Sequence, residues 1–297
     1  MSELAIRRLR RLLPTPAPRS VADRSTKPLT RLVLGLITWV IVLVLFFPVF
    51  WMALTGFKRE ADANTSTPHF VFTPTLDEYK SVWQGSSGLR PYLEHSLVIS
   101  IVSTVLVIVI AVPAAYALSI RPVPKWRDVL FFFISTKMLP IVGAIIPLFV
   151  IARDAHLLDT ERLMVVLYMA MNLPIAVWML RSFLLEVPIE VIEASRVDGA
   201  GLLRQLRTIV LPIVRPGLAA TALICFIFAW NEFFLVVNLT TTQAATVPVF
   251  LVGFVAPEGQ FLAHLSAAAT IACLPVLIAG WVAQDKLVRG LSMGAVK

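Results

Sequence analysis

Lys137, Asn231 and Glu232 are the residues whose chemistry stands out, because each lies inside a long apolar run. A charged side chain at the centre of a membrane-spanning helix costs about 2.5–3.5 kcal/mol on insertion scales, so such groups usually face a cavity or a partner. They indicate either the wall of a polar path across a membrane or packing. In the packing alternative, Asn231 and Glu232 bridge helices and Lys137 extends to the membrane surface.

Chemistry of an enzymatic kind is not expected. No nucleophile, base or metal cluster converges in the apolar runs, so no catalytic residue and no metal ligand is assigned. Cys225 and Cys273 both lie in apolar runs and are expected to be buried small hydrophobes. The sequence holds no GxxxxGK[ST] string, so the chain is not expected to bind ATP. The histidines are dispersed and give no metal-ligand spacing: His69, His95, His156 and His264.

The stretch 186–214 has the pattern of two short helices. Pro188 suits a first helical turn, and Gly199 and Gly201 weaken the helix that follows. Beyond them, one apolar face is predicted from the spacing of Leu202, Leu203, Leu206, Ile209 and Val210. Pro212 marks the end of this segment and the entry to the next apolar run. The prediction is a pair of helices with a glycine-bearing bend that lies against a membrane face.

The elements that position these residues are membrane-spanning helices. The chain is 58% hydrophobic and 15% charged, with a mean hydropathy of +0.83, so most of it must lie in lipid. A bilayer core of about 30 Å needs roughly 20 apolar residues in a helix. Six stretches meet this requirement and predict an all-α integral membrane protein: 32–54, 96–120, 129–152, 163–185, 215–237 and 262–284.

The charge distribution predicts the orientation of these spans. With a cytoplasmic N-terminus, 19 Lys and Arg residues fall on the inside and six on the outside, and Lys137 remains in a span. This bias predicts that both termini and the 186–214 loop are cytoplasmic. It also accounts for the formal net charge of +8, so nucleic acid is not an expected partner.

The predicted organisation follows from the spans. The expected parts are a flexible basic tail over 1–31, a first span over 32–54, an external loop over 55–95, a core of five spans over 96–285 with the cytoplasmic loop 186–214, and a cytoplasmic tail over 286–297. The basic tail, with its prolines, has two alternative roles: an unstructured tail or an arm that contacts anionic lipid.

The 186–214 loop resembles the EAA loop of ABC-importer permeases. In that family the loop forms a coupling helix in a cleft of the ATPase subunit. Here Ser195 takes the place of the usual second alanine, a small-for-small exchange, and Asp198 fits the version seen in sugar importers. The resemblance implies a coupling role for the matching residues: Glu193, Ala194, Ser195, Asp198, Gly199, Ile209, Leu211 and Pro212.

Three further strings extend the resemblance. Trp230-Asn231-Glu232-Phe233 resembles a segment of carbohydrate permeases of the maltose-transporter type. The tail Gly294-Ala295-Val296-Lys297 resembles the end of the same subunit, without its usual final glycine. The string 135–140, with 157–160 downstream, is similar to the sorbitol/mannitol branch.

The resemblance implies a type I ABC-importer permease in a bacterial inner membrane, for a sugar or sugar alcohol. The implied partners are a second homologous permease subunit, two ATPase subunits, an external or periplasmic solute-binding protein and membrane lipid. ATP and Mg²⁺ belong to the ATPases, and no cofactor is expected in this chain. The alternative is a self-sufficient secondary transporter that uses Glu232 or Lys137 for proton coupling. Such carriers often show internal repeats, and this sequence shows none that is convincing.

Overall fold

The computed structural model describes residues 28–65, 67–84, 88–121, 123–256 and 259–295. The chain divides into two compact units, Met1–Trp51 and Met52–Lys297. Most of the predicted basic tail 1–31 and the last two residues lie outside the described residues. In the first unit the helix α2 (Pro28–Thr55) begins earlier than the predicted 32, and its last turn continues into the second unit. It is long and apolar enough to cross a membrane.

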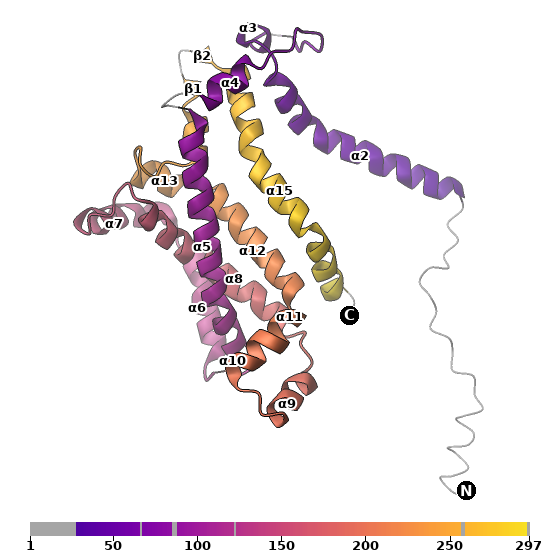
Figure 1. Cartoon of the computed structure of the whole chain (residues 1–297), viewed down its shortest axis with the longest axis vertical. Coiled ribbons are helices and arrows are strands. Elements are labelled where there is room, and N and C mark those ends of the chain that lie inside the picture. The colour runs from indigo at the N-terminus through magenta and orange to yellow at the C-terminus, as the bar shows by residue number, and fades with distance from the viewer. Residues whose placement is uncertain (1–27, 66, 85–87, 122, 257–258, 296–297) are drawn as a thin grey trace, which may run out of the picture. The chain divides into compact units, whose positions relative to one another are not determined.

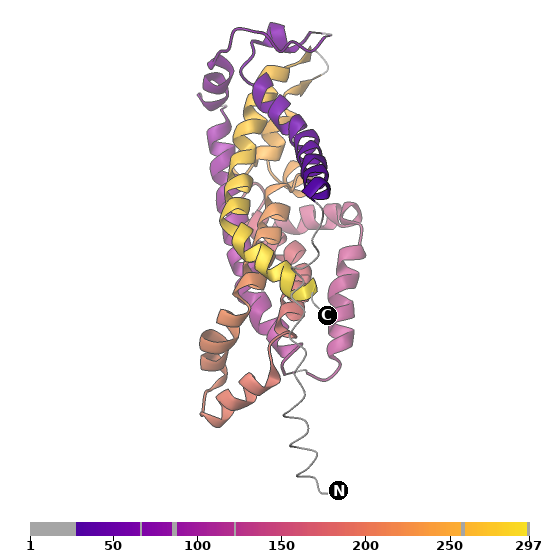
Figure 2. The ribbon, with the colours of Figure 1, turned by 90° about the vertical axis from the view of Figure 1, so that its right-hand side faces the viewer.

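The second unit is built around four long helices that pack against one another (Figures 1 and 2): α5 (Leu89–Ala117), α8 (Glu161–Leu184), α12 (Arg215–Trp230) and α15 (Leu262–Ala295). The most extensive contact joins α5 and α8, and α12 contacts α5, α8 and α15. Small side chains permit this close packing in the absence of a hydrophobic driving force between helices in lipid. On α5 they include buried Ser100, Ser103 and Ala111, and on α15 buried Ala267 and Ala268.

Two of the predicted spans are not single straight helices. The predicted span 129–152 is wrong as one helix, because α6 (Trp126–Met138) and α7 (Ile141–Asp154) meet at a bend of 90°. Pro140 lies at that break, where it cannot donate a backbone hydrogen bond. The predicted span 215–237 is also interrupted, since α12 ends at Trp230 and α13 (Phe234–Leu239) follows separately. The described residues contain four helices able to cross a membrane, or up to six if each bent pair is one span.

The two ends of the second unit carry short elements. At one end lie α3 (Glu60–Ala63), α4 (Asp77–Trp83) and the strands β1 (Val255–Ala256) and β2 (Gly259–Gln260), which follow α14 (Val247–Val252). The strands pair antiparallel, with Val255 opposite Gln260, and are a small exception to the predicted all-α architecture. The helix α5 begins at Leu89, so the predicted loop 55–95 is shorter and partly helical.

The opposite end carries the 186–214 loop (Figures 1 and 2). It consists of α9 (Ile189–Val197), α10 (Leu202–Gln205), the π-helix η1 (Leu206–Val210) and α11 (Leu211–Ile213). The segment Leu202–Ile213 meets α12 at a bend of 82°. The predicted pair of helical segments on either side of Gly199 is therefore confirmed. Pro212 lies inside α11, so the segment ends at Ile213, one residue beyond the predicted end.

Candidate functional site

The 186–214 loop is anchored to the bundle by its inner side. Ile192 and Val210 are fully buried and belong to one apolar cluster with Ala115 of α5 and Leu180 of α8. This cluster continues from the spans into the loop, so it fixes the loop as a packed part of the second unit. Burying side chains of this size contributes about 1.5–3 kcal/mol each.

The loop also has buried polar contacts. Ser195, the third residue of the Glu-Ala-Ser string, is 4% exposed, and its hydroxyl donates to the Ile192 carbonyl at 2.7 Å. The amide of Gln205, which is 1% exposed, donates to the Ser195 hydroxyl and to the Ile192 carbonyl. The phenol of Tyr116, at the end of α5, donates to the Gln205 side-chain oxygen at 2.6 Å. The sequence patterns gave no signal for Gln205 or Tyr116.

The outer side of the loop is exposed and partly apolar. Glu193, Ala194 and Asp198, which are predicted coupling residues, are all exposed. Val197 between them is 87% exposed, and Leu202 and Leu203 are 53% and 63% exposed. Large exposed apolar side chains rimmed by charged residues are typical of interaction sites.

The end of α9 depends on Gly199. Its φ is +73°, in the left-handed region that glycine adopts at little cost, and its N–H donates to the Arg196 carbonyl. The N–H of Ala200 donates to the Ser195 carbonyl, which closes the last turn. The predicted bend is therefore present, and it is made by Gly199; Gly201 has an ordinary φ of −67°.

The predicted apolar face of the second helix is wrong in part. Leu202 and Leu203 are exposed, whereas Gln205 and Val210 are buried. A regular α-helix would place Leu202 and Leu206 on one face, but η1 has the wider π turn, which rotates the following residues relative to α10. Of the remaining predicted coupling residues, Ile209 and Leu211 are half-buried and Pro212 is exposed.

Arg181 contacts residues at the ends of two other helices near the loop. It lies in the last turn of α8, and its Nε donates to the carbonyl of Leu118, the residue that caps α5. The guanidinium also lies 4.4 Å from the centroid of the Trp126 ring, at the start of α6. A cation near a helix C-terminus and over an indole face is favourable in both contacts.

The three polar groups predicted for the spans lie in different settings. Lys137 is exposed in the last turn of α6, just before the 90° bend. Asn231 is exposed after α12, with its Nδ2 donating to the Ile227 carbonyl. The ion pairs of the described residues do not include one between Lys137 and Glu232.

Glu232 is held by backbone groups. One carboxylate oxygen accepts from the N–H of Leu235 at 2.9 Å, and the other accepts from Val236 N–H and the phenol of fully buried Tyr168. These contacts place the carboxylate at the start of α13 and connect α8 to the break after α12. The helix-bridging alternative thus has a specific geometry in this structure.

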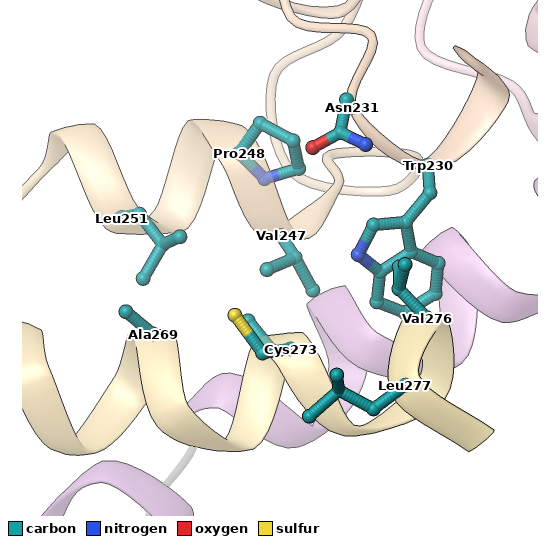
Figure 3. Close-up of a pocket in the computed structure, with 10 residues that line it drawn as sticks. Trp230, Asn231, Val247, Pro248, Leu251, Ala269, Cys273, Val276 and Leu277 are labelled. Carbon is teal, nitrogen blue, oxygen red and sulfur yellow. The ribbon is translucent and has the colours of Figure 1, made fainter. Parts of the chain in front are cut away.

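Asn231 also lines a cavity of about 320 Å³ between α12, α14 and α15 (Figure 3). The lining is mostly apolar, and the Trp230 indole lies beside Val276 of α15. The amide of Asn231 is a polar group at the edge of this apolar wall. In the described residues no group of three His, Cys, Asp or Glu side chains is arranged to hold a metal.

Asp159 holds together two segments that are more than 80 positions apart in the sequence. Its carboxylate accepts from the N–H groups of Thr241, Thr242, Gln243 and Ala244 and from the Thr241 hydroxyl. Partial burial raises the pKa of Asp159, but these hydrogen bonds outweigh it and lower the pKa to about 2. The residue itself has a φ of +56°, in the left-handed region. It fixes the segment between α13 and α14 on the loop before α8.

These features define a helical membrane protein with several spans and a two-helix loop packed onto one end of the bundle. The chain belongs to the family described as binding-protein-dependent transport system inner membrane component, whose model matches residues 107–292. The match includes the 186–214 loop and α12. It makes the chain a multi-pass inner-membrane component of a transport system, consistent with a protein that is not itself an enzyme.

Relatives cover nearly the whole chain. It is 35% identical over 274 residues to the probable ABC transporter permease protein y4oR of Sinorhizobium fredii, covering 92% of this chain and 98% of that protein. It is 32% identical to the diacetylchitobiose uptake system permease protein DasC of Streptomyces coelicolor, covering 87% and 94%. It is 31% identical to the trehalose transport system permease protein SugB of Mycobacterium tuberculosis, covering 84% and 92%.

The fold also matches solved structures. The crystal structure of a bacterial ABC transporter involved in the import of alginate aligns with a TM-score of 0.72 at 21% identity, covering 92% of this chain and all of that chain. A second structure, of the alginate transporter in complex with an alginate-bound periplasmic protein, aligns with a TM-score of 0.60 at 14% identity. The chain therefore has the type I ABC permease fold.

Proposed function

We propose that this chain is one of two permease subunits of an ABC importer for a sugar or sugar alcohol, and that its 186–214 loop is the coupling surface for an ATPase subunit. The family match and the relatives named for chitobiose and trehalose uptake support this proposal. The similarity of 135–140 and 157–160 to the sorbitol/mannitol branch motivates the inclusion of polyols.

One observation carries the coupling proposal. The loop buries Ile192, Ser195 and Val210 in the bundle, yet leaves Val197 87% exposed on the opposite side. An isolated surface would gain from a polar residue at such a position, whereas a docking surface needs an apolar contact. An anchored inner side and an exposed, partly apolar outer side suit an element that transmits force.

The proposed mechanism follows from this arrangement. ATP and Mg²⁺ bind to two partner ATPase subunits, and their closure moves the 186–214 loop. The movement turns the cavity between the two permeases outward, where a solute-binding protein delivers the cargo, and hydrolysis resets it inward. In this proposal the loop and both termini face the cytoplasm, as the 19-to-6 distribution of Lys and Arg predicts.

Lys137 and Asn231 are proposed to line the translocation path. Both are exposed at interruptions of the spans. There, side-chain donors and acceptors can reach a hydroxyl-rich solute, and backbone groups freed from helical hydrogen bonds can line the same path. Glu232 contributes by holding the start of α13, because its carboxylate oxygens already accept backbone N–H groups. That geometry gives no support to Glu232 as the proton carrier of a secondary transporter.

Co-purification tests the coupling proposal. The permease pair and a tagged ATPase are co-expressed with Val197→Asp or with the control Val71→Asp, which changes a side chain that is 93% exposed at the other end of the unit. We expect Val197→Asp to release the ATPase and Val71→Asp to retain it, because a buried unpaired carboxylate opposes docking. Retention of the ATPase by both variants rejects the loop as the coupling surface.

Cargo is tested through the cognate binding protein. Calorimetric titration with trehalose, chitobiose, melibiose, sorbitol and mannitol separates disaccharides from polyols. Tight binding of a phosphate, a peptide or an amino acid instead contradicts the carbohydrate assignment. Uptake by this chain alone in liposomes, driven by a proton gradient, contradicts the ABC-importer assignment and favours the secondary transporter.

A further inference from the structure

The side chain of Gln205, in α10, joins the neighbouring helix α9 to the end of α5, which is far away in the sequence. Its Nε2 donates to the Ile192 carbonyl at 3.1 Å and to the Ser195 hydroxyl at 2.5 Å, both in α9. Its Oε1 accepts from the phenol of Tyr116, in the last turn of α5 and 89 positions earlier. All three side chains are at most 4% exposed, so water does not compete for these bonds.

The orientation of this amide is determined by its partners. The Ile192 carbonyl can only accept, so the Gln205 nitrogen must face it and the oxygen must face the Tyr116 phenol. The Ser195 hydroxyl accepts a hydrogen bond from Gln205 and donates one to the Ile192 carbonyl. The hydrogen-bond chain from α5 through α10 to α9 is therefore complete and has one direction.

These bonds differ in kind from the apolar contacts around them. Ile192, Val210 and Ala115 pack through dispersion and the hydrophobic effect, which are non-directional and allow small sliding of one element on another. Buried hydrogen bonds fix both distance and angle, and breaking one leaves a desolvated polar group. Relative movement of α9, α10 and the end of α5 is therefore opposed by this chain of bonds.

We propose that Gln205 and Tyr116 are positioning residues for coupling, which make α9, α10 and the end of α5 move as one body. The inference rests on the proposed function and adds the route by which loop movement reaches a span. Without the Gln205 hydrogen bonds, an ATPase that displaces α9 only changes the bend at Gly199 and makes α9 slide on the apolar cluster, so the movement does not reach α5. With them, the displacement is carried to α5, which packs against both α8 and α12.

A spin-label distance measures this directly. Nitroxides at Arg121→Cys, after α5, and Arg196→Cys, in α9, are placed in a background with Cys225→Ala and Cys273→Ala. The full complex of two permeases, two ATPases and the binding protein is studied nucleotide-free and after trapping with MgATP and vanadate. We expect the distance between labels to stay unchanged on trapping with Gln205 present, and to shift and broaden in Gln205→Leu.

A triple variant separates positioning from simple stability. Gln205→Leu leaves the Tyr116 phenol buried without its acceptor. Tyr116→Phe/Ser195→Ala/Gln205→Leu removes every polar side-chain atom of the chain of bonds and leaves only the Ile192 carbonyl, which belongs to the α9 backbone. We expect the triple variant to recover the melting temperature of the complex but to retain the distance shift. The binding protein, purified with its native cargo, should stimulate ATP hydrolysis about tenfold less in Gln205→Leu and in the triple variant than in the unaltered complex. Thr208→Val, which removes an exposed hydrogen bond of the same segment, is the control and should match the unaltered complex.

The outcomes distinguish this inference from the proposed function. If the triple variant recovers both the melting temperature and an unchanged label distance on trapping, the positioning role is overturned. Lost stability then accounts for the whole effect of Gln205→Leu. A distance that already shifts in the unaltered complex also overturns it. Failure of the unaltered permease to bind the ATPase at all rejects the proposed function instead.

Discussion

Gly199 is the residue where a single added methyl group should matter most for the loop. Its φ of +73° is costly for any residue with a Cβ, by about 1–2 kcal/mol, although no atom beyond the neighbouring residues lies within 4 Å of the position that a Cβ would take. We expect Gly199→Ala to loosen the end of α9 and speed hydrogen exchange over the 186–214 loop, measured by mass spectrometry.

Gly201→Ala is the matched control for this prediction. Gly201 has a φ of −67° and equally open surroundings, so its exchange pattern should stay the same. Equal acceleration in both variants would show that glycine at either position is needed only for flexibility. The backbone conformation at Gly199 would then have no special part in the bend.

Asp159 carries a separate residue-scale prediction. Its carboxylate accepts from four backbone N–H groups and a hydroxyl, and Asp159→Asn turns one acceptor into a donor that faces them. We expect a loss of about 1–2 kcal/mol at pH 7, read as a lower melting temperature in detergent. Asp154→Asn is the control. It removes an ion pair with Arg153 whose side chains are 59% and 62% exposed, and it should change the melting temperature little.

The pH dependence of the Asp159 effect has a definite sign. Its pKa is about 2 in the folded protein, below the ordinary 3.8, so the unfolded chain takes up the proton first as the pH falls. The stabilisation is therefore complete above about pH 4 and is lost between about pH 4 and pH 2. The difference in melting temperature between the native chain and Asp159→Asn should shrink over that interval. A difference in melting temperature that stays constant down to pH 2 would contradict a stabilising role for the ionised Asp159 carboxylate.

Gln205, Tyr116 and Asp159 show what sequence patterns alone miss at this scale. Each makes its decisive contacts with residues that are distant in the sequence, up to 89 positions for Tyr116 and Gln205. Hydrophobic periodicity reports which face of one helix is buried, and it holds no information on which polar group a distant segment will bring there. The glycine bend at 199 was predictable because its cause is local.

At the scale of elements, α8 and α12 approach closely at Gly217. A Cβ built there would lie 2.2 Å from Cγ of the Phe183 ring, so the helices or the ring must move. We expect Gly217→Ala to destabilise the protein by about 1–3 kcal/mol through overpacking, measured as a lower melting temperature. Gly280→Ala in α15, with no neighbour within 4 Å, should leave it unchanged or raise it. Unchanged stability in Gly217→Ala would mean that the contact adapts at little cost.

The prolines explain why element boundaries were harder to predict than element types. Pro48, Pro113, Pro174 and Pro275 lie inside continuous helices, whereas Pro140 lies at a 90° break. The local effect of each proline is the same, since each removes one donor and crowds the preceding turn. Whether the helix continues depends on how neighbouring helices satisfy the freed carbonyl, which is a tertiary property. The broken helix at Pro140 is therefore invisible to composition.

At the scale of the whole molecule, composition was the strongest guide. Length, apolar content and the spacing of apolar runs predicted a helical membrane protein, and the family match confirmed it. The distribution of Lys and Arg adds an orientation, because translocation of positive charge is unfavourable and the bias of 19 to six is large. The orientation itself stays a prediction.

Cysteine labelling tests the orientation with a pair of matched positions. Val71 and Val197 are 93% and 87% exposed, and they lie at opposite ends of the second unit. In spheroplasts that lack the ATPase subunits, so that docking cannot shield the loop, we expect Val71→Cys to react with a membrane-impermeant maleimide. Val197→Cys should react only after the membrane is permeabilised, because 186–214 is predicted to be cytoplasmic. The reverse pattern would invert the topology and place the loop where no ATPase could reach it, so it would remove the coupling proposal together with the orientation.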